Sequence, residues 1–264
     1  MPSDDLLALY DDRMREPPPT PPRGAVYERV GPLVRIVGQF RGFVSAPRDV
    51  GVRGVELDRL IAEQRDYFAA RGEAVEWKVR AHDEPTDLPD RLRAAGFVAE
   101  DAETVLVGSA PDMVAAPPLP NGVRVRRVSS GHDLRRLAEM LSAVWGQDWS
   151  ALADDLGSRI EAAPDDIAVF VAEAGGEIVS AAWLVYFGAA DVAGLWGGST
   201  RVEWRGRGIY RALVGVRAVL AVDCGIRHLQ VDASEDSAPI LRRLGFHEVT
   251  TTTPYIWRPG VEEP

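Results

Sequence analysis

The six residues from Arg205 to Tyr210, with the sequence RGRGIY, combine residue types that suit the binding of an anion. They lie between a strand-like run that ends near Val202 and a helix-like run that begins near Ile209. Two glycines leave the main chain uncovered where the first turn of a helix exposes unpaired N–H groups. Such groups, together with the helix dipole, bind phosphate well. The segment is therefore predicted to bind a phosphate or pyrophosphate.

Two common phosphate-binding loops are excluded by the residues that they require. A P-loop needs a Lys-Ser/Thr pair after its last glycine, and this chain has Ile209 and Tyr210 there. A dinucleotide-binding fingerprint needs a third small residue three positions after the second glycine, and that position is Arg211. Neither nucleotide-binding motif fits this segment.

The segment resembles the pyrophosphate loop of the GNAT acetyltransferase superfamily, whose pattern is Arg/Gln-x-x-Gly-x-Gly/Ala. Arg205 and Gly208 match this pattern, whereas Tyr210 stands where a small residue is usual. An ordinary turn rich in arginine and glycine is the alternative interpretation of six residues. The elements that flank the loop decide between the two.

Those elements follow the order of a complete GNAT fold over residues 123–257. Hydrophobic periodicity and turn residues predict strands, helices and one hairpin across Gly175-Gly176. Two glycines in the strand before the loop, Gly197 and Gly198, predict a bulge or a close backbone approach. In order, the expected elements are a strand at 123–128, helices at 132–145 and 149–162, strands at 167–174, 177–187 and 192–202, a helix from 209 to Gly225, a strand at 228–233, a helix at 238–244 and a strand at 248–257.

The first part of the chain echoes the second, which indicates an internal repeat. Residues 53–55 resemble residues 207–209, and each set starts a helix that ends at a glycine. The endings at residues 92–97 and 241–246 nearly match as well. This first copy resembles the truncated, ligand-free GNAT half of some two-part bacterial acetyltransferases, because it lacks room for the opening strand and both early helices.

The predicted fold class is therefore α/β, with a mixed sheet and two related parts. Gly51 stands where the second copy has Arg205, so we expect the first copy to shape the substrate site or the structure rather than to bind a second acetyl-CoA. Four prolines after Ser109 predict a linker. The predicted domains are an arm at 1–24, a degenerate GNAT-like half at 25–108, a proline-rich linker at 109–121 and a catalytic GNAT domain at 122–264.

The resemblance implies acetyl-CoA as co-substrate. Its pantetheine arm would add to the strand that ends near Val202, and its pyrophosphate would cap the following helix. Ser234 lies where many family members place an Asn that contacts pantetheine, although a strand-end cap explains it equally well. The residues implied as cofactor contacts are Thr200, Arg201, Val202, Arg205, Gly206, Arg207, Gly208, Ile209, Tyr210 and Ser234.

The catalytic residues are less well defined by the sequence. Many family members protonate the leaving thiolate with a Tyr at the position of Leu241, so Tyr210 and Tyr255 are the candidate substitutes. A thiolate is a fair leaving group, and solvent can also complete this step. The candidate bases are carboxylates on or beside the predicted cleft strands, and a relayed water would serve equally well. These carboxylates are Asp191, Glu203 and Asp232.

Composition limits the remaining function classes. A net charge of −10 over 264 residues argues against binding to nucleic acid and suits a cationic substrate such as an amine. Cys224 is the single cysteine, and the histidines have no metal-ligand spacing, so no metal is expected. No apolar run reaches bilayer length and the N-terminus is acidic, so a cytoplasmic protein without membrane contact is expected.

These observations predict an acetyl-CoA-dependent N-acetyltransferase that acts on a primary amine of a small molecule, as a monomer or homodimer. The alternative is a non-catalytic protein that binds an acyl-CoA as a sensor or interaction module. The position of Leu241 and the uncertain base favour this alternative, and the loop at Arg205 does not distinguish the two.

Overall fold

The computed structural model describes residues 3–15, 17, 21, 24–39, 41–186 and 191–260. Here the described residues up to Ser109 are called the N-terminal half, and those from Ala110 onward the C-terminal half. The elements of the N-terminal half are α1 (Ser3–Met14), β1 (Val26–Val30), β2 (Leu33–Val37), β3 (Gly42–Ser45), α2 (Gly54–Arg71), β4 (Val75–Arg80), α3 (Leu88–Ala94), β5 (Val98–Ala99) and β6 (Glu103–Ser109). Those of the C-terminal half are the 3-10 turn η1 (Pro111–Met113), β7 (Val123–Val128), α4 (Gly131–Trp145), α5 (Ser150–Ala162), β8 (Ile167–Ala174), β9 (Glu177–Tyr186), β10 (Val192–Thr200), the 3-10 turn η2 (Val202–Trp204), α6 (Ile209–Asp223), β11 (His228–Ala233), α7 (Ala238–Leu244) and β12 (His247–Trp257).

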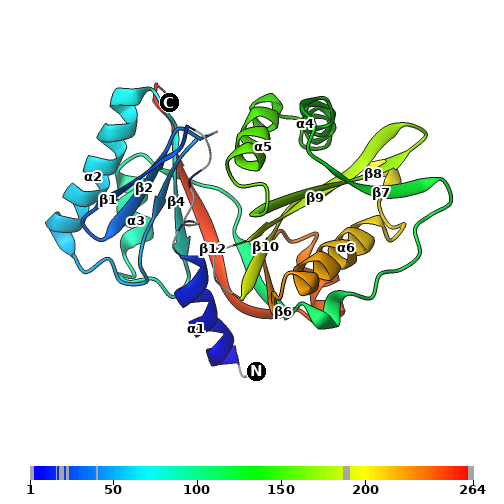
Figure 1. The fold of residues 1–264 in the computed structure, drawn as a ribbon. Helices are drawn as coiled ribbons and strands as arrows, with labels where there is room; N and C mark the ends of the chain where they lie inside the picture. The colour runs from blue at the N-terminus through cyan, green and yellow to red at the C-terminus, as the bar shows by residue number, and fades with distance from the viewer. Residues whose placement is uncertain are drawn as a thin grey trace.

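The strands form one continuous mixed sheet that runs through both halves. The strand order is β1-β2-β3-β4-β12-β6-β11-β10-β9-β8-β7, and β5 pairs with β12 beside this path. Figure 1 shows β12 running between the two halves, with α2 and α3 beside the N-terminal strands and α4, α5 and α6 around the C-terminal strands. The predicted fold class, α/β with a mixed sheet in two parts, is confirmed.

The two halves exchange a strand at the middle of this sheet. The N-terminal strand β6 pairs with β11 of the C-terminal half from Thr104 to Ser109, and the end of β12 pairs with β4 of the N-terminal half. The two crossing strands, β6 and β12, also pair with each other. Each half therefore contributes a strand to the sheet of the other. We infer that separating the halves would leave strand edges unpaired in both.

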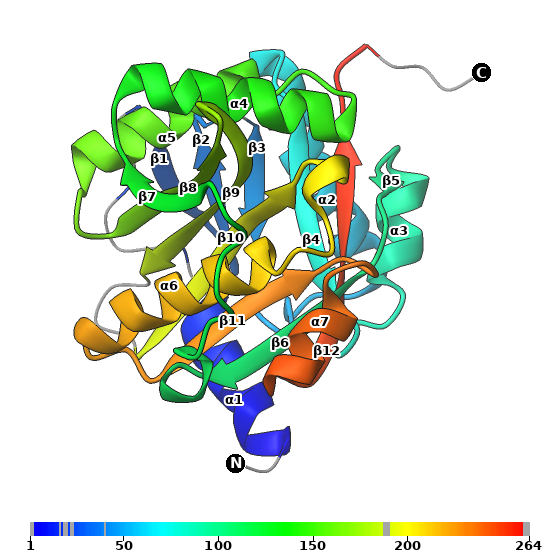
Figure 2. The ribbon, with the colours of Figure 1, turned by 90° about the vertical axis from the view of Figure 1, so that its right-hand side faces the viewer.

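Helices cover both faces of the C-terminal strands. One cluster of buried side chains packs α6 and α7 against one face, and a second packs α4 and α5 against the other. Burial on both faces explains why β8 and β9 are almost continuously apolar instead of alternating. Figure 2, viewed from the side, shows α4 and α5 separated from α6 and α7 by the strands. A third cluster forms the core of the N-terminal half under α2 and α3.

The segment that follows the N-terminal half differs from the expected linker. The predicted linker at 109–121 has few anchoring side chains in the sequence, yet Ala110 and Met113 are buried under α6 and α7. Ala116 lies against Gly215 of α6 so closely that a Cβ at Gly215 would meet it at 2.7 Å. This proline-rich segment is therefore packed against the C-terminal half, because its small residues allow a close approach.

The strand before the loop also differs from its prediction. It is shorter than expected, because β10 ends at Thr200 and Val202 begins the turn η2.

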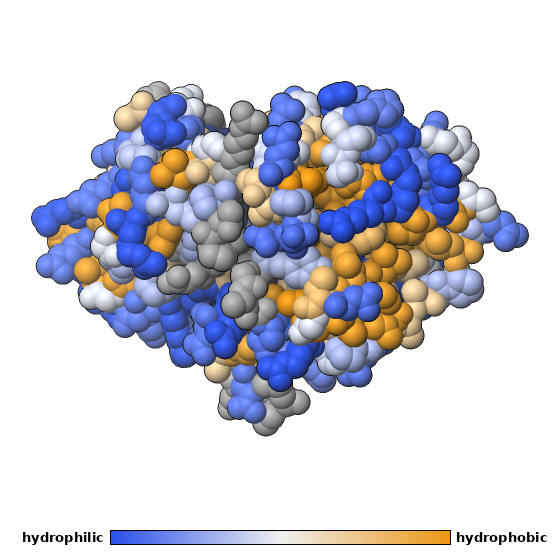
Figure 3. Space-filling view, viewed as in Figure 1, coloured by the Kyte–Doolittle hydropathy of each residue, from blue (hydrophilic) through white to orange (hydrophobic). Residues whose placement is uncertain are grey.

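Apolar side chains gather over α6 in the space-filling view (Figure 3), where Val219 and Val222 are exposed. Among the helices of the described residues, none is long and apolar enough to span a bilayer.

Candidate functional site

The strands β10 and β11 start side by side and then separate. Their parallel pairing covers only the register from Val192 to Gly194 of β10, opposite His228 to Gln230 of β11. On its other side, β10 stays paired with β9 up to Thr200. The Arg201 N–H donates to the Val179 carbonyl of the β9 side at 2.9 Å, so by alternation the N–H and C=O of Thr200 point toward the open side. The structure thus exposes a free strand edge in the described part of the sheet.

A bulge in β10 accompanies this separation. The register with β9 shifts between Trp196 and Ser199, as Gly197-Gly198 predicts. Gly197 has φ +62°, and a Cβ there would lie 1.9 Å from the Trp183 ring. A Cβ at Gly198 would lie 2.6 Å from the Tyr210 ring. Both glycines are therefore required by close side-chain neighbours and, at Gly197, by left-handed backbone.

A buried arginine of α6 hydrogen-bonds to the backbone beside the bulge. Arg217 is 1% exposed and hydrogen-bonds to backbone carbonyls, with Nε donating to Leu213 O at 2.9 Å and Nη1 donating to Trp183 O at 3.2 Å and to Trp196 O at 3.4 Å. No carboxylate among the described residues forms an ion pair with it. Burial lowers the pKa of the Arg217 guanidinium to about 10. The sequence does not predict this residue, because an arginine on a helix is normally solvent-exposed.

The loop before α6 has the geometry of an anion site. Gly206 and Gly208 adopt φ of 72° and 81°, the left-handed region that glycine tolerates. In the described part of the chain, no acceptor bonds the amide N–H groups from Gly206 to Arg211, and the first helical bond runs from Ala212 N–H to Gly208 O. α6 also lacks an N-terminal side-chain cap. The predicted pyrophosphate loop therefore presents unsatisfied donors at a helix N-terminus.

The other predicted cofactor contacts lie around this loop. Thr200 O accepts a hydrogen bond from Arg205 Nε at 3.2 Å, and Arg207 stacks 4.8 Å from the Trp204 ring centroid. Val202 lies outside the strand and is 68% exposed, so its predicted backbone role in the strand edge does not fit. Arg201 uses its N–H and its side chain on the β9 side.

Ser234 lies at the end of β11 and is exposed. Its carbonyl accepts the N–H groups of Ser237 and Ala238, and its hydroxyl lies 3.2 Å from the Ser237 hydroxyl. These contacts fit the strand-end cap and leave the Ser234 side chain accessible. Its predicted contact with pantetheine stays a prediction.

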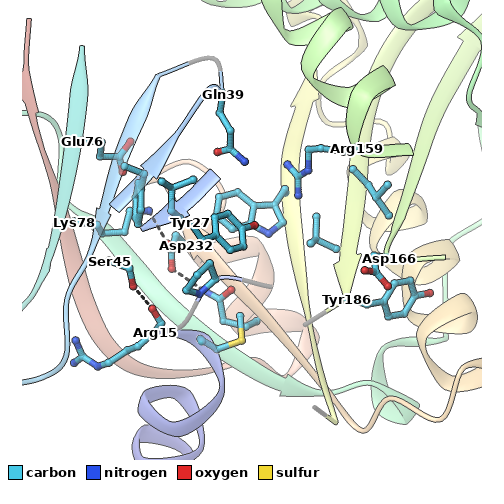
Figure 4. A pocket seen from close by; sticks show the side chains of 18 of the residues that line it. Arg15, Tyr27, Gln39, Ser45, Glu76, Lys78, Arg159, Asp166, Tyr186 and Asp232 are labelled. Carbon is cyan, nitrogen blue, oxygen red and sulfur yellow. Dashed lines mark hydrogen bonds and ion pairs between the residues drawn. The ribbon is translucent and has the colours of Figure 1, made fainter. Parts of the chain in front are cut away.

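A cavity of about 310 Å³ lies between the two halves (Figure 4). One wall comes from α1 and β1 to β4, and the other from α5, β8 and β9. Trp196 of β10 and the pair Gln230 and Asp232 of β11 connect these walls. The alternate β11 residues, such as Val231, pack under α6 and α7 instead. The cavity thus meets the diverging strands on the sheet face opposite α6.

An ion pair between the halves forms part of this cavity. Lys78, the only lysine of the chain, donates to Asp232 at 2.8 Å and to Glu103 at 3.2 Å. Lys78 and Asp232 side chains are 10% and 11% exposed. The two carboxylates raise the Lys78 pKa against the opposing effect of burial. The sequence predicts Asp232 at the cleft but not its partner, because the contact joins residues 154 positions apart.

Neighbouring side chains hydrogen-bond to both oxygens of the Asp232 carboxylate. Besides Lys78 on Oδ2, Gln230 Nε2 donates to its Oδ1 at 2.6 Å. Both Asp232 oxygens therefore already accept hydrogen bonds from neighbouring side chains. Of the predicted bases, Asp232 is the one that lines the cavity, while Glu203 is exposed on η2.

Asp191 and Tyr255 lie away from the point where β10 and β11 separate. Asp191 precedes β10 at the opposite end from Thr200 and pairs with Arg227 at 2.5 Å. Tyr255 is buried in the N-terminal core, opposite Trp77 in the β12–β4 register. Their positions do not support the predicted catalytic roles, because neither side chain lines the cavity or the loop.

Tyr210, unlike Asp191 and Tyr255, lies beside the part of β10 that has separated from β11. It occupies the first turn of α6 and its ring lies against Gly198 of the separated part of β10. Burial raises the pKa of its phenol, while the Arg217 charge and a hydrogen bond with Ser237 act in the opposite direction. Leu241, which stands at the usual acid position, is fully buried in the core. Tyr210 is thus a protonated phenol at neutral pH beside the strand opening.

Known proteins share this architecture. Residues 134–246 match the model of the acetyltransferase (GNAT) family. The structure resembles that of a GCN5-related N-acetyltransferase from Kribbella flavida, with a TM-score of 0.68, 19% identity and coverage of 98% of this chain and 96% of that chain. No curated protein sequence is significantly similar to the chain.

Two further solved structures have the same fold. A tandem GNAT protein from the clavulanic acid biosynthesis pathway matches with a TM-score of 0.62, 15% identity and coverage of 98% of this chain and 97% of that chain. A GCN5-related N-acetyltransferase from Sphaerobacter thermophilus matches with a TM-score of 0.60, 19% identity and coverage of 89% and 84%, respectively. The chain thus matches the acetyltransferase (GNAT) family over residues 134–246, and over nearly its whole length it shares the fold of GNAT proteins that include a tandem one.

Proposed function

We propose that this protein transfers the acetyl group of acetyl-CoA to a primary amine of a small molecule, in a ternary complex. One observation carries the proposal: β10 leaves β11 after Gly194, and the unpaired amides from Gly206 to Arg211 follow this opened strand. A free strand edge followed by an anion site suits a ligand with an amide-containing arm and a pyrophosphate. The family match over residues 134–246 supports acetyl-CoA as that ligand.

In this arrangement the pantetheine arm pairs with the free edge of β10, where Thr200 offers its N–H and C=O. The pyrophosphate accepts hydrogen bonds from the α6 loop, and Arg205 and Arg207 add positive charge. The thioester then reaches the opening between β10 and β11. The acceptor enters from the cavity on the opposite face, which is enclosed by both halves and is at the small end of the range for small-molecule sites.

The chemistry is acyl transfer by direct attack. The neutral amine nitrogen bonds to the thioester carbonyl carbon, the tetrahedral intermediate collapses, and the C–S bond breaks with its electrons on sulfur. Because alkylamines have a pKa of about 10, the attacking nitrogen first loses a proton to water in the cavity. As the intermediate collapses, its nitrogen loses a second proton to water and becomes the neutral amide nitrogen. The thiolate takes a proton from the Tyr210 phenol, which solvent then reprotonates. A free N–H of β10 near Thr200 stabilises the oxyanion.

A second function is favoured by two observations. Leu241 replaces the usual acid, and both oxygens of Asp232 are already engaged with Lys78 and Gln230. A protein with these features could bind acetyl-CoA without turnover, as a sensor or interaction module.

Thiol release over a panel of primary amines, with mass analysis of the products, separates the two functions. We expect thiol release that depends on the amine and an acetylated amine as product. Tyr210→Phe should lower kcat about 10- to 100-fold with little change in acetyl-CoA affinity, whereas Tyr255→Phe should leave kcat unchanged. Acetyl-CoA binding without release for any amine would contradict the transferase and support the sensor.

A further inference from the structure

Arg159 of α5 differs from Lys78 and Arg41, two other cations of the cavity. Its guanidinium points into the space between the halves (Figure 4), and its side chain is 25% exposed. Among the described residues, its one ion-pair partner is Asp155, whose Oδ2 lies 3.9 Å from Nη1. That distance is too long for a hydrogen bond. Burial lowers the pKa of the Arg159 guanidinium, and the Asp155 carboxylate opposes this effect.

The neighbouring basic groups are compensated at close range. Lys78 bonds Asp232 at 2.8 Å, and Arg41 lies 2.7 Å from Glu76. Lys78 joins the two halves, Arg41 bonds within one wall, and Arg80 donates to the Tyr10 hydroxyl at 3.1 Å and to the Lys78 carbonyl at 3.2 Å, so these cations are already engaged. The five N–H donors of Arg159, in contrast, are available to an acceptor that enters the cavity.

The wall opposite Arg159 carries neutral polar groups. Figure 4 shows Gln39 and Tyr27 of the N-terminal half on the side that Arg159 faces. The Arg159 charge acts on the Tyr27 phenol, whose pKa is raised by burial and lowered by this arginine. The carboxylates of Asp155 and Asp166 lie on the same wall as Arg159. An anion therefore fits between Arg159 and Gln39 rather than deeper along α5.

We propose that the acceptor is an amine that also carries an acidic group, a carboxylate or a phosphate, and that Arg159 binds this group. The inference rests on the proposed acetyl transfer, in which the amine lies at Trp196 and Asp232 where β10 and β11 separate. Apolar side chains also line the cavity, including Phe43 and Ile167. They suit a short hydrocarbon segment between the two charged ends. A planar guanidinium binds either oxyanion through paired hydrogen bonds.

The test compares acceptors that share one amine and differ at the far end. For chains of three to six carbons, thiol release is measured with the n-alkylamine, the matched ω-amino acid, the matched diamine and the matched aminoalkyl phosphate. The amine pKa values are similar across the set, so differences report the far group. We expect kcat/KM to be about 10- to 100-fold higher for one of the acidic acceptors than for the alkylamine, with the diamine slowest. The carboxylate and phosphate series show which acid is preferred.

Arg159→Met should abolish this preference, so that kcat/KM for the acidic acceptors falls to that for the matched alkylamine. Arg135→Met, at an exposed position on α4, is the matched control and should retain the preference. Equal rates for acidic and alkyl acceptors, or a preference that survives Arg159→Met, would overturn the proposal.

A binding measurement keeps the proposal testable if no amine is acetylated. The protein saturated with CoA is titrated with the same ω-amino acids, aminoalkyl phosphates and alkylamines. Binding of the acidic compounds that is lost in Arg159→Met would support the anion site even though the transferase proposal had failed. Absence of such binding would overturn the anion site itself.

Discussion

The loops that precede α2 and α6 lead into corresponding helices of the two halves. They differ in whether a side chain of the loop already occupies the position of an anion. Before α2, the carboxylate of Asp49 accepts the Gly51 N–H at 2.8 Å and pairs with Arg53 at 2.9 Å. Before α6, the amides from Gly206 to Arg211 have no acceptor within the described residues. The first loop therefore carries its own anion, whereas the second leaves that position to a ligand.

The first loop shows that the helix of a repeated fold can persist without an open anion site before it. α2 still ends at Gly72 and packs its buried face on the N-terminal sheet, so its structural role is intact. The N-terminal half instead contributes to the other site, because β4 supplies Glu76, Lys78 and Arg80 to the shared cavity. One half thus provides the predicted cofactor site, and both provide the cavity beside it.

The largest expected effect comes from placing a carboxylate in the second loop. Gly208→Glu should abolish detectable acetyl-CoA binding by titration calorimetry, since the new carboxylate would occupy the phosphate position and repel it. The equivalent change in the first loop, Gly54→Glu, is the matched control, because Gly54 also has positive φ. It should leave the affinity unchanged. Similar losses in both variants would show that the two loops do not differ as described.

The next effect concerns the ion pair that joins the halves. Lys78→Met should lower the free energy of unfolding by about 3 kcal/mol, because it leaves the Asp232 carboxylate buried without its cation. Chemical denaturation measures this loss. Adding Asp232→Asn should recover much of the stability, and a double variant as unstable as the single one would contradict a direct pairing.

A smaller effect distinguishes the buried polar residues of the two long helices. Arg217 of α6 and Gln64 of α2 each bond the carbonyl four residues earlier in the helix. Arg217 also holds the Trp196 carbonyl at the bulge. We expect Arg217→Met to weaken acetyl-CoA binding about tenfold, since β10 would lose its support, and Gln64→Met to change stability alone. Arg217→Lys should recover little affinity, because one ammonium cannot replace the Nε bond to the Leu213 carbonyl together with the two Nη1 bonds to β9 and β10.

The smallest effect tests a support of the C-terminal half alone. Hydrogen bonds from Arg126, together with Arg124 and Arg136, lower the pKa of Glu173 from 4.5 to about 2. A carboxylate with a lowered pKa stabilises the fold above its unfolded value and loses that contribution as the pH falls. Stability should therefore decline between about pH 4.5 and pH 2. Glu173→Gln should cost about 1 to 2 kcal/mol at pH 7 and flatten this decline, and an unchanged pH profile would contradict the assignment.

Much of the fold follows from local sequence signals. Glycines at 72, 146 and 225 mark the ends of helices, and Gly197-Gly198 marks the bulge of β10, because each requires a backbone or a contact that other residues resist. The loop before α6 was predictable for the same reason. These features depend on a few neighbouring residues, which a sequence displays directly.

The rest depends on contacts between distant residues. Pairing of β6 with β11 brings Glu103 beside Lys78 and Asp232, and no local pattern encodes that arrangement. Asp191 and Tyr255 were predicted from their strands, but a strand has two ends and two faces, and the sequence did not show which one the site uses. Arg159 was missed because its cavity exists only where both halves meet.

Amide hydrogen exchange with and without acetyl-CoA tests the difference between the two loops most directly. We predict that acetyl-CoA protects the amides of Gly206 to Arg211 and of Thr200, and leaves those of Gly51 to Leu57 unchanged. Equal protection of both loops, or none at the second, would contradict the assignment of the cofactor site to the C-terminal half.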